Sequence, residues 1–283
     1  MNSLQSTELE ILKAFIGVCE QLKIKYFLVC GTALGAVKYN GFIPWDDDVD
    51  VGLYREDYEE FCNKAQALLP DYYFLQTYKT DNKFPCIYCK IRDSRTTYIE
   101  KSMSSLNINH GVYIDVFPLD GYPKNKEESA ILEKQKRIHE LKLASAFKTT
   151  KQHSLKSKIF LKIERMLGYH RRTAKTVLKL EKILSQWRIE ESELVCNHGN
   201  WQGKLEYAPK SQYGEGVLVD FEGIKVRVPE NYDEYLTQKY GDWRAELPKE
   251  QQIGHHYYEI MDLNTPYKKY VRKSFGGSIK IIR

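Results

Sequence analysis

Four acidic residues fall within five positions of the chain, at Asp46, Asp47, Asp48 and Asp50. Carboxylates this close together repel one another, because each negative charge raises the pKa of its neighbours. A divalent cation removes that repulsion, and oxygen ligands of this kind suit Mg²⁺ or Mn²⁺, which keep positions open for phosphate oxygens. The cluster therefore predicts metal-assisted phosphoryl chemistry, with an acidic turn that faces solvent as the alternative.

The residues around the cluster predict how it is positioned. Asp48 and Asp50 alternate with Val49 and Val51, so a strand would place the two carboxylates on one side and the valines in the core. Upstream, Gly31-Thr32 stands where a predicted strand meets a predicted helix. Backbone amides and a hydroxyl at a helix N-terminus form a site for a phosphate group.

The rest of the chain predicts mixed helices and strands. The Asp115 side chain lies in a second alternating strand, which we expect to end at Pro118. A helix with apolar positions from Leu9 to Leu22 would be capped by Thr7 and Glu10. Further expected elements are a strand over 26–30, helices over 33–39 and 57–69, strands within 72–98, helices over 126–188, a hairpin over 217–228, a helix from 229 to 241 and a loose tail over the last ten residues.

Charge is unevenly distributed along the chain. The 283 residues carry a net charge of +5, but residues 124–182 hold 17 Lys and Arg against six Asp and Glu. This basic stretch predicts a surface that meets something anionic. Its apolar positions Ile159, Phe160, Ile163 and Leu167 would allow peripheral contact with an anionic membrane, although a solvated helix face is the more ordinary outcome. Nucleic acid is not expected, because no recognised binding module accompanies the charge.

Composition points to an intracellular enzyme. No apolar run approaches the roughly 20 residues of a membrane span, and the N-terminus has no signal-like segment, so we expect a cytoplasmic protein. The six cysteines are scattered and do not suggest a disulfide framework. Cys86 and Cys89 have the spacing of half a zinc site, but no second Cys or His pair follows at a familiar distance.

The segments 31–38 and 41–51 resemble the LicD family, which includes the fukutin-related proteins. Other pieces typical of that family follow in order: residues 55–58, 111–120, 228–229, 240–242 and a late histidine pair. Lys38 stands where the family has arginine or histidine, and the arginine expected before His255 is missing. The resemblance extends from residue 31 to residue 256.

The resemblance implies an α+β fold of the nucleotidyltransferase type seen in DNA polymerase β, with a mixed sheet, flanking helices and a basic helical insertion. It divides the chain into a catalytic core over 1–123, the basic insertion over 124–190 and a C-terminal part over 191–283 that completes the catalytic domain. It also implies an enzyme that transfers phosphocholine, or a related phospho-alcohol, from CDP-choline or another CDP-alcohol. The acceptor would be a sugar hydroxyl of a cell-surface glycan precursor, such as teichoic acid or lipopolysaccharide. If that acceptor is lipid-linked, the protein would work at the inner face of the cytoplasmic membrane.

The resemblance also implies roles for individual residues. Asp48 and Asp50 would hold Mg²⁺ or Mn²⁺, Asp46 would be an additional ligand, and Asp115 would be the third catalytic carboxylate, which orients a second ion or accepts a proton. The phosphates of the donor would be bound by residues that offer cations, ring nitrogens or backbone amides: Gly31, Thr32, Lys38, Arg55, Lys90 and His255.

Three other functions fit parts of the pattern. A metal-dependent glycosyltransferase also uses an Asp-x-Asp motif, although such folds usually place a nucleotide-binding sheet before it. A nucleotidyltransferase that acts on a small molecule would share the fold and leave a nucleotide on the acceptor. A binding module would use the acidic segment to hold a structural cation.

Overall fold

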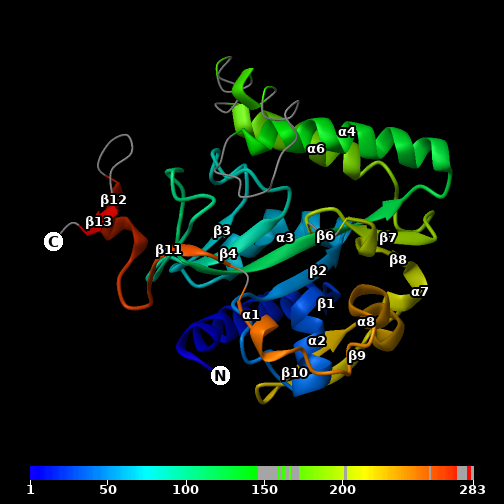
Figure 1. The fold of residues 1–283 in the computed structure, drawn as a ribbon, viewed down its shortest axis with the longest axis horizontal. Coiled ribbons are helices and arrows are strands. Elements are labelled where there is room, and N and C mark those ends of the chain that lie inside the picture. The colour runs from blue at the N-terminus through cyan, green and yellow to red at the C-terminus, as the bar shows by residue number, and fades with distance from the viewer. Residues whose placement is uncertain are drawn as a thin grey trace.

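The computed structural model describes residues 1–145, 159, 161–163, 166, 172–200, 203–254, 256–272 and 279–281. Helices flank a mixed sheet that carries both parallel and antiparallel strand pairs (Figure 1). The expected α+β class is therefore confirmed. The three-part division of the chain stays a prediction.

Within the described residues, seven strands form the central sheet. Five of them follow the order β1-β2-β6-β4-β3, and β7 pairs with β6 and β8. The pair β2·β6 is parallel and the others are antiparallel. The bounds are β1 Tyr26–Leu28, β2 Asp50–Tyr54, β3 Tyr73–Gln76, β4 Cys89–Asp93, β6 Val112–Tyr122, β7 Leu194–Asn197 and β8 Tyr207–Pro209.

Strand β6 continues through Pro118, so the prediction that it ends there is wrong. On the edge opposite β2, strand β4 pairs with β6 as far as Val116, and β7 begins to pair at Leu119. Pro118 falls between these two partners, where no hydrogen bond from its nitrogen is needed. The long strand can therefore link the acidic end of the sheet to β7.

Helices α1 (Ser3–Leu22) and α3 (Arg55–Leu68) pack against strands of the central sheet. The apolar stripe of α1 is buried as expected, with Phe15 fully inaccessible. Its capping box is formed by Asn2 and Gln5, so the predicted cap at Thr7 is wrong. Thr7 instead donates to the Ser3 carbonyl inside the first turns of the helix.

A smaller layer covers the β1 edge of the sheet. It contains α2 (Cys30–Tyr39), η2 (Gly203–Glu206), α7 (Lys210–Tyr213), β9 (Val217–Phe221), β10 (Ile224–Val228) and α8 (Tyr232–Tyr240). The expected hairpin is confirmed by the antiparallel register of β9 and β10. Helix α8 ends at Gly241, whose positive φ of 67° suits glycine.

Two helices of the basic stretch lie together at one side of the molecule (Figure 1). They are α4 (Lys126–Ala144) and α6 (Thr173–Leu184). Together with the end of β6 and with β7, they bury a separate apolar cluster of Tyr122, Leu132, Leu143, Val177, Leu180, Leu184 and Cys196. Among the described residues, no helix is long and apolar enough to cross a bilayer.

The C-terminal segment returns to the acidic end of the sheet. Its strand β11 (Tyr258–Asp262) pairs with β5 (Thr97–Glu100), with η3 (Lys249–Gln251) before it and η4 (Tyr267–Lys269) after it. The chain then forms β12 (Tyr270–Arg272), which pairs with β13 (Ile279–Ile281). The expectation of a loose tail over the last ten residues is therefore wrong for β13.

Candidate functional site

The acidic residues occupy a loop and the strand that follows it. We call residues 44–49, between α2 and β2, the acid loop; it holds Asp46, Asp47 and Asp48, which are half-buried. Strand β2 starts only at Asp50, so the prediction that Asp48 and Asp50 share one strand is wrong. The sheet fixes Asp50, whereas contacts from other elements position the three loop aspartates.

Asp50 and Asp115 face each other across the parallel pair β2·β6. Side chains at paired positions project from the same face of the sheet. On the other side of β6, Lys90 of β4 is paired with Asp115, and its Nζ lies 2.9 Å from Asp115 Oδ1. The structure therefore brings the predicted residues Asp50, Asp115 and Lys90 together on three adjacent strands.

The start of α2 positions Asp50 and approaches Asp46. The Asp50 amide donates to Thr32 Oγ1 at 2.8 Å, so this hydroxyl acts on the backbone of the acidic strand. A Cβ added to Gly31 would lie 3.1 Å from Asp46 Oδ2, which shows how closely the helix backbone approaches that carboxylate. Cys30 has a φ of 53°, a strained conformation for a residue with a side chain, and its amide donates to the Tyr235 hydroxyl. The start of α2 therefore lies directly beside the acid loop.

Helix α1 contacts the acid loop from another side. Gln5 Nε2 donates to the carbonyls of Ile43 and Asp46, each at 3.1 Å. Glu8 lies three residues later, on the same face of the helix, and is 2 % exposed. Its Oε2 has no hydrogen-bond partner among the described residues. A further buried carboxylate thus adjoins the cluster.

The C-terminal segment closes over the loop through His256. Its amide and its Nδ1 lie 3.0 Å from the two carboxylate oxygens of Asp47, and its Nε2 lies 3.6 Å from Asp48 Oδ2. Gly254 passes so close to Asp47 that an added Cβ would overlap its carboxylate. The Tyr98 hydroxyl donates to the His256 carbonyl, which anchors this segment to β5.

Electrostatics at the site reflect crowded negative charge. Burial and the charges of Asp48 and Asp115 raise the pKa of Asp50 well above its ordinary value. Burial, followed by Asp48 and Asp47, raises the pKa of Asp46 in the same way. Burial and the three loop aspartates raise the pKa of Glu8.

Two positive groups oppose that repulsion in part. Burial raises the pKa of Asp115, and Lys90 offsets much of this effect. Burial lowers the pKa of His256, but Asp48 and Asp47 outweigh it and bring the value to about 10. A protonated His256 therefore neutralises part of the acid loop in the cation-free protein.

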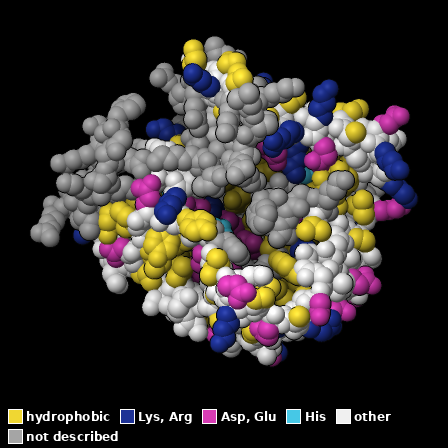
Figure 2. All heavy atoms as spheres, viewed as in Figure 1, with side chains coloured by type: hydrophobic (Ala, Val, Ile, Leu, Met, Phe, Trp, Pro, Cys, Tyr) yellow, Lys and Arg dark blue, Asp and Glu magenta, His cyan; other side chains and the backbone are white. Residues whose placement is uncertain are grey.

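These donor atoms fit a divalent cation. Carboxylate oxygens dominate the site, and the elevated pKa values show that the protein's own positive groups do not neutralise them. Glu8 Oε2 is buried without a hydrogen bond among the described residues, whereas Asp115 Oδ1 is buried with the Lys90 ammonium 2.9 Å away. Figure 2 shows acidic side chains gathered beside a histidine in a hollow near the middle of one face. A cation that enters this hollow would meet oxygen ligands on several sides.

Lys90 also belongs to a buried charge network behind Asp115. Its Nζ lies 3.6 Å from Glu100 Oε1 and 3.3 Å from the centroid of the Tyr113 ring. Arg92 Nη2 donates to Glu100 Oε2 at 3.0 Å. Burial raises the pKa of Glu100, but Lys90 and Arg92 outweigh it and lower the value to about 2. Lys90 is only 1 % exposed, so it acts mainly on Asp115 and Glu100.

The structure gives Arg55 and Lys38 partners other than the acid cluster. Arg55 forms two hydrogen bonds with the Asp120 carboxylate, of 2.6 and 2.8 Å, in the protein interior. Asp120 is five positions from Asp115 on β6, so the two side chains project from opposite faces of the sheet. Lys38 Nζ donates to the carbonyls of Trp243 and Ala245. These contacts favour structural roles over the predicted binding of donor phosphate. His255 lies outside the described residues.

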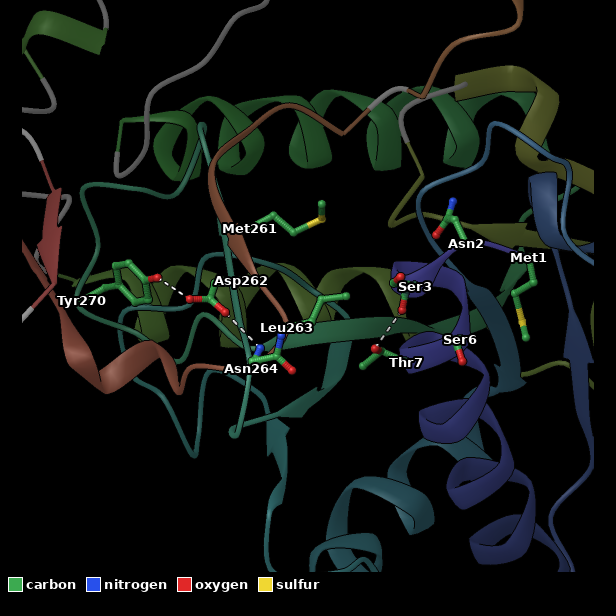
Figure 3. Close-up of a pocket in the computed structure, with 10 residues that line it drawn as sticks. All are labelled: Met1, Asn2, Ser3, Ser6, Thr7, Met261, Asp262, Leu263, Asn264 and Tyr270. Carbon is green, nitrogen blue, oxygen red and sulfur yellow. Dashed lines mark hydrogen bonds between the residues drawn. The ribbon is translucent and has the colours of Figure 1, made fainter.

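A separate cavity of about 860 Å³ lies between the start of α1 and β11. Figure 3 shows its lining, in which Asp262 accepts hydrogen bonds from Tyr270 and from the Asn264 amide. None of the acidic residues of the site lines this cavity. The acidic side chains that could bind a cation therefore lie outside this cavity.

The two cysteines of the possible zinc motif have different neighbours. Burial and a hydrogen bond with Cys62 raise the pKa of the Cys89 thiol, whereas Cys86 is hydrogen-bonded to Tyr88. Among the described residues, the group of three or more side chains with ligand atoms close enough for one metal ion is Asp47, Asp48 and His256. The cysteine motif gains no support from this geometry.

Comparisons with known proteins agree with the sequence motifs. The model of the family described as LicD/FKTN/FKRP, nucleotidyltransferase domain, matches residues 23–147. The lipopolysaccharide cholinephosphotransferase LicD of Haemophilus influenzae is 31 % identical over 264 residues, which cover 89 % of this chain and 94 % of that protein. The chain belongs to the LicD family. The expected family membership is thereby confirmed.

A second LicD relative is similar over a short segment only. Human ribitol 5-phosphate transferase FKRP is 44 % identical over 48 residues, which cover 17 % of this chain and 10 % of that protein. An uncharacterised protein of Rickettsia typhi is 47 % identical over 49 residues, or 17 % of this chain and 15 % of that protein.

The structure adds three residues to the predicted LicD site. Asp47 belongs to the acidic cluster, but the motif assigns it no individual role, and His256 belongs to the histidine pair, of which only His255 is assigned to the donor. Glu8 lies in a predicted amphipathic helix, where a charged residue is ordinary and does not indicate a functional site. Only the return of the C-terminal segment to β5 and the packing of α1 on the acid loop bring these side chains to the site.

Proposed function

We propose that this LicD-family protein transfers phosphocholine, or a related phospho-alcohol, from a CDP-linked donor to a sugar hydroxyl of a cell-surface glycan precursor. Lipopolysaccharide and teichoic acid are the classes of acceptor that we favour. The observation that supports this proposal most strongly is the 31 % identity to a lipopolysaccharide cholinephosphotransferase over nearly the whole chain. The pairing of Asp50 with Asp115 and the effect of the charges of Asp46 and Asp48 on Asp50 also support it.

In the proposed reaction, the oxygen of the sugar hydroxyl forms a bond to the phosphorus that carries choline. The bond between that phosphorus and the bridging oxygen breaks, and CMP leaves with the electron pair. Mg²⁺ or Mn²⁺, held by Asp48 and Asp50 with Asp46 as a further ligand, would supply charge neutralisation for the pyrophosphate.

The chain's own residues would orient the reactants and move the proton. Asp115 Oδ1 accepts the proton of the sugar hydroxyl, and Lys90 beside it limits how far the pKa of Asp115 rises. The first turn of α2 would hold a donor phosphate through the backbone amides of Gly31 and Thr32, with Gly31 leaving room for close approach. Thr32 keeps Asp50 in place through the Asp50 amide. The central mixed sheet would correspond to the core of a nucleotidyltransferase fold.

A donor panel tests this proposal. The protein is incubated with Mg²⁺, a glycan acceptor and CDP-choline, CDP-ribitol or CDP-glycerol, and the release of CMP and the modified glycan are measured. We expect CMP release together with a phospho-alcohol on the sugar. A nucleotide on the acceptor would indicate a nucleotidyltransferase, and a sugar nucleotide as the active donor would indicate a glycosyltransferase. An absence of turnover with every donor would count against transferase function.

We also propose that the acceptor is lipid-linked and is met at the cytoplasmic face of a membrane. The basic stretch supports this idea, as do the exposed side chains of Ile159, Ile163 and Met166, which are 52 %, 48 % and 79 % accessible. Sedimentation with vesicles tests it. Anionic vesicles should bind the protein in a salt-sensitive way, whereas zwitterionic vesicles should not.

A further inference from the structure

His256 is placed to do more than neutralise the acid loop. Its two ring nitrogens meet different carboxylates, with Nδ1 at 3.0 Å from Asp47 Oδ1 and Nε2 at 3.6 Å from Asp48 Oδ2. The first distance is that of a hydrogen bond, and the second is too long for one. The two nitrogens therefore play different parts at this site.

The arrangement on the Nδ1 side is typical of a histidine that binds a metal ion. Metal-binding histidines usually donate their other ring N–H to a carboxylate, which fixes the tautomer and the orientation of the ring. Asp47 takes that position, and it also accepts the backbone amide of His256 at 3.0 Å. Ring and backbone are thus held by one carboxylate, and Nε2 is directed toward Asp48.

The separation on the Nε2 side suits a shared cation. Two ligands that each lie about 2.1 Å from one ion are roughly 3.0–3.4 Å apart in octahedral or tetrahedral geometry. The observed 3.6 Å is close to that range. One ligand atom from each of Asp47, Asp48 and His256 can be chosen so that all three lie within 4.8 Å of one another.

We propose that His256 Nε2 is a ligand of the divalent cation that Asp48 holds, with Asp47 as the carboxylate that orients the imidazole. This proposal rests on the cation site of the proposed function and extends it with a nitrogen ligand from the C-terminal segment. Buried Glu8, whose Oε2 has no hydrogen bond among the described residues, lies behind the same loop.

A nitrogen ligand has two consequences. Imidazole suits transition metals better than it suits Mg²⁺, so the site should bind Mn²⁺ more tightly than Mg²⁺. The ligand also comes from a segment more than 200 residues away from the acid loop in sequence. Cation binding should therefore tie the segment before β11 to the loop and complete the wall of the site.

Electron spin-echo spectroscopy of bound Mn²⁺ tests the proposal on the full-length protein. A directly coordinated imidazole nitrogen modulates the Mn²⁺ echo, and labelling of histidine with ¹⁵N identifies the source. We expect this modulation in the wild type and in the control variant His139→Gln, which alters a histidine of α4. It should disappear in His256→Gln, together with at least a tenfold rise in the Kd for Mn²⁺ and a smaller preference for Mn²⁺ over Mg²⁺.

Replacement of the orienting carboxylate, Asp47, should give a different result in the same experiment. In Asp47→Asn the nitrogen modulation should persist, while the affinity for Mn²⁺ falls about tenfold to 100-fold, as for other outer-shell partners. Mn²⁺ that binds without a histidine nitrogen signal would overturn the proposal and leave His256 as an ion-pair partner, with the proposed function intact. A protein that binds no Mn²⁺ would overturn both this proposal and the cation site of the proposed function.

Discussion

Asp50 and Asp115 occupy facing positions in the parallel pair β2·β6, and Lys90 flanks Asp115 from the next strand. Two buried carboxylates on adjacent strands destabilise the folded state unless a positive charge compensates them. Lys90 compensates Asp115, whereas the positive charge that lowers the pKa of Asp50 is that of His256 on another segment. The site is therefore built with an excess of negative charge at Asp50 and in the acid loop.

Replacement of Asp50 by Asn should raise stability and abolish activity. Because the carboxylate has a raised pKa, its neutral isostere removes repulsion at neutral pH. In EDTA we expect the Tm of Asp50→Asn to be at least roughly 2–4 °C above that of the wild type, which corresponds to about 1 kcal/mol in a chain of this size. Transfer should fall at least 100-fold. Asp71→Asn, at an exposed position, is the control and should change neither property; equal loss of activity in both variants would contradict the assignment.

The hydroxyl of Thr32 should affect stability and activity by holding the backbone of Asp50 in place. In Thr32→Val the buried Asp50 amide loses its acceptor, which costs about 1–3 kcal/mol of stability. Thr32→Ser keeps the oxygen and should remain close to the wild type. Urea unfolding measures the difference, and the transfer rate should follow it. If the serine and valine variants behave alike, the hydrogen bond is not what positions Asp50.

The sequence predicts those residues of the site that belong to short local motifs. Asp46, Asp48, Asp50 and Asp115 lie in short motifs whose residue types already suggest metal binding. Lys38 and Arg55 looked equivalent in sequence, because a cation near a motif suggests phosphate binding. Their partners, the 243–245 backbone and Asp120, are far away in the chain and only packing reveals them. Pro118 predicts the end of a strand, but β6 continues through it. Proline is acceptable there because it lies in the gap between the partners β4 and β7, which the sequence does not reveal.

Arg55 should prove structural. Arg55→Met leaves Asp120 buried and unpaired, which should destabilise the protein by about 3–5 kcal/mol. The double variant Arg55→Met with Asp120→Leu should recover most of that loss, because replacing both partners removes the unpaired charge. In the double variant the KM for the CDP-alcohol should stay within about twofold of the wild type. A well-folded double variant with a KM raised tenfold or more would place Arg55 at the donor.

Glu100 should stabilise the fold in a pH-dependent manner. Its folded-state pKa of about 2 is below its ordinary value of 4.5, so its contribution is present above pH 4.5 and is lost as the pH falls toward 2. Glu100→Gln should therefore be less stable than the wild type at pH 7, by up to about 3 kcal/mol from a shift of this size. The difference should shrink as the pH is lowered from 4.5 to 3. Urea midpoints at several pH values measure it, and a gap that does not change with pH would contradict the ion-pair network with Lys90 and Arg92.

Glu8 should have the opposite pH dependence, and a cation should reverse it. Burial and the loop aspartates raise its folded-state pKa above 4.5, so the stability linked to its protonation is present below pH 4.5 and is lost as the pH rises through the folded-state value. In EDTA, Glu8→Gln should thus be more stable than the wild type at pH 8, and the two should converge toward pH 4.5. The control Glu59→Gln, at an exposed position of α3, should match the wild type throughout.

Saturating Mn²⁺ should reduce the difference in stability between Glu8→Gln and the wild type at pH 8, because it stabilises the wild type more. A ligand present at 100 times its Kd stabilises the folded state by about 2.7 kcal/mol, and the wild type should gain more than Glu8→Gln because it presents one more carboxylate to the cation. Differential scanning fluorimetry at pH 8, with and without Mn²⁺, gives both values. Equal Mn²⁺-induced shifts in the two proteins would mean that the Glu8 charge does not reach the cation, and that this residue serves only to pack α1 against the acid loop.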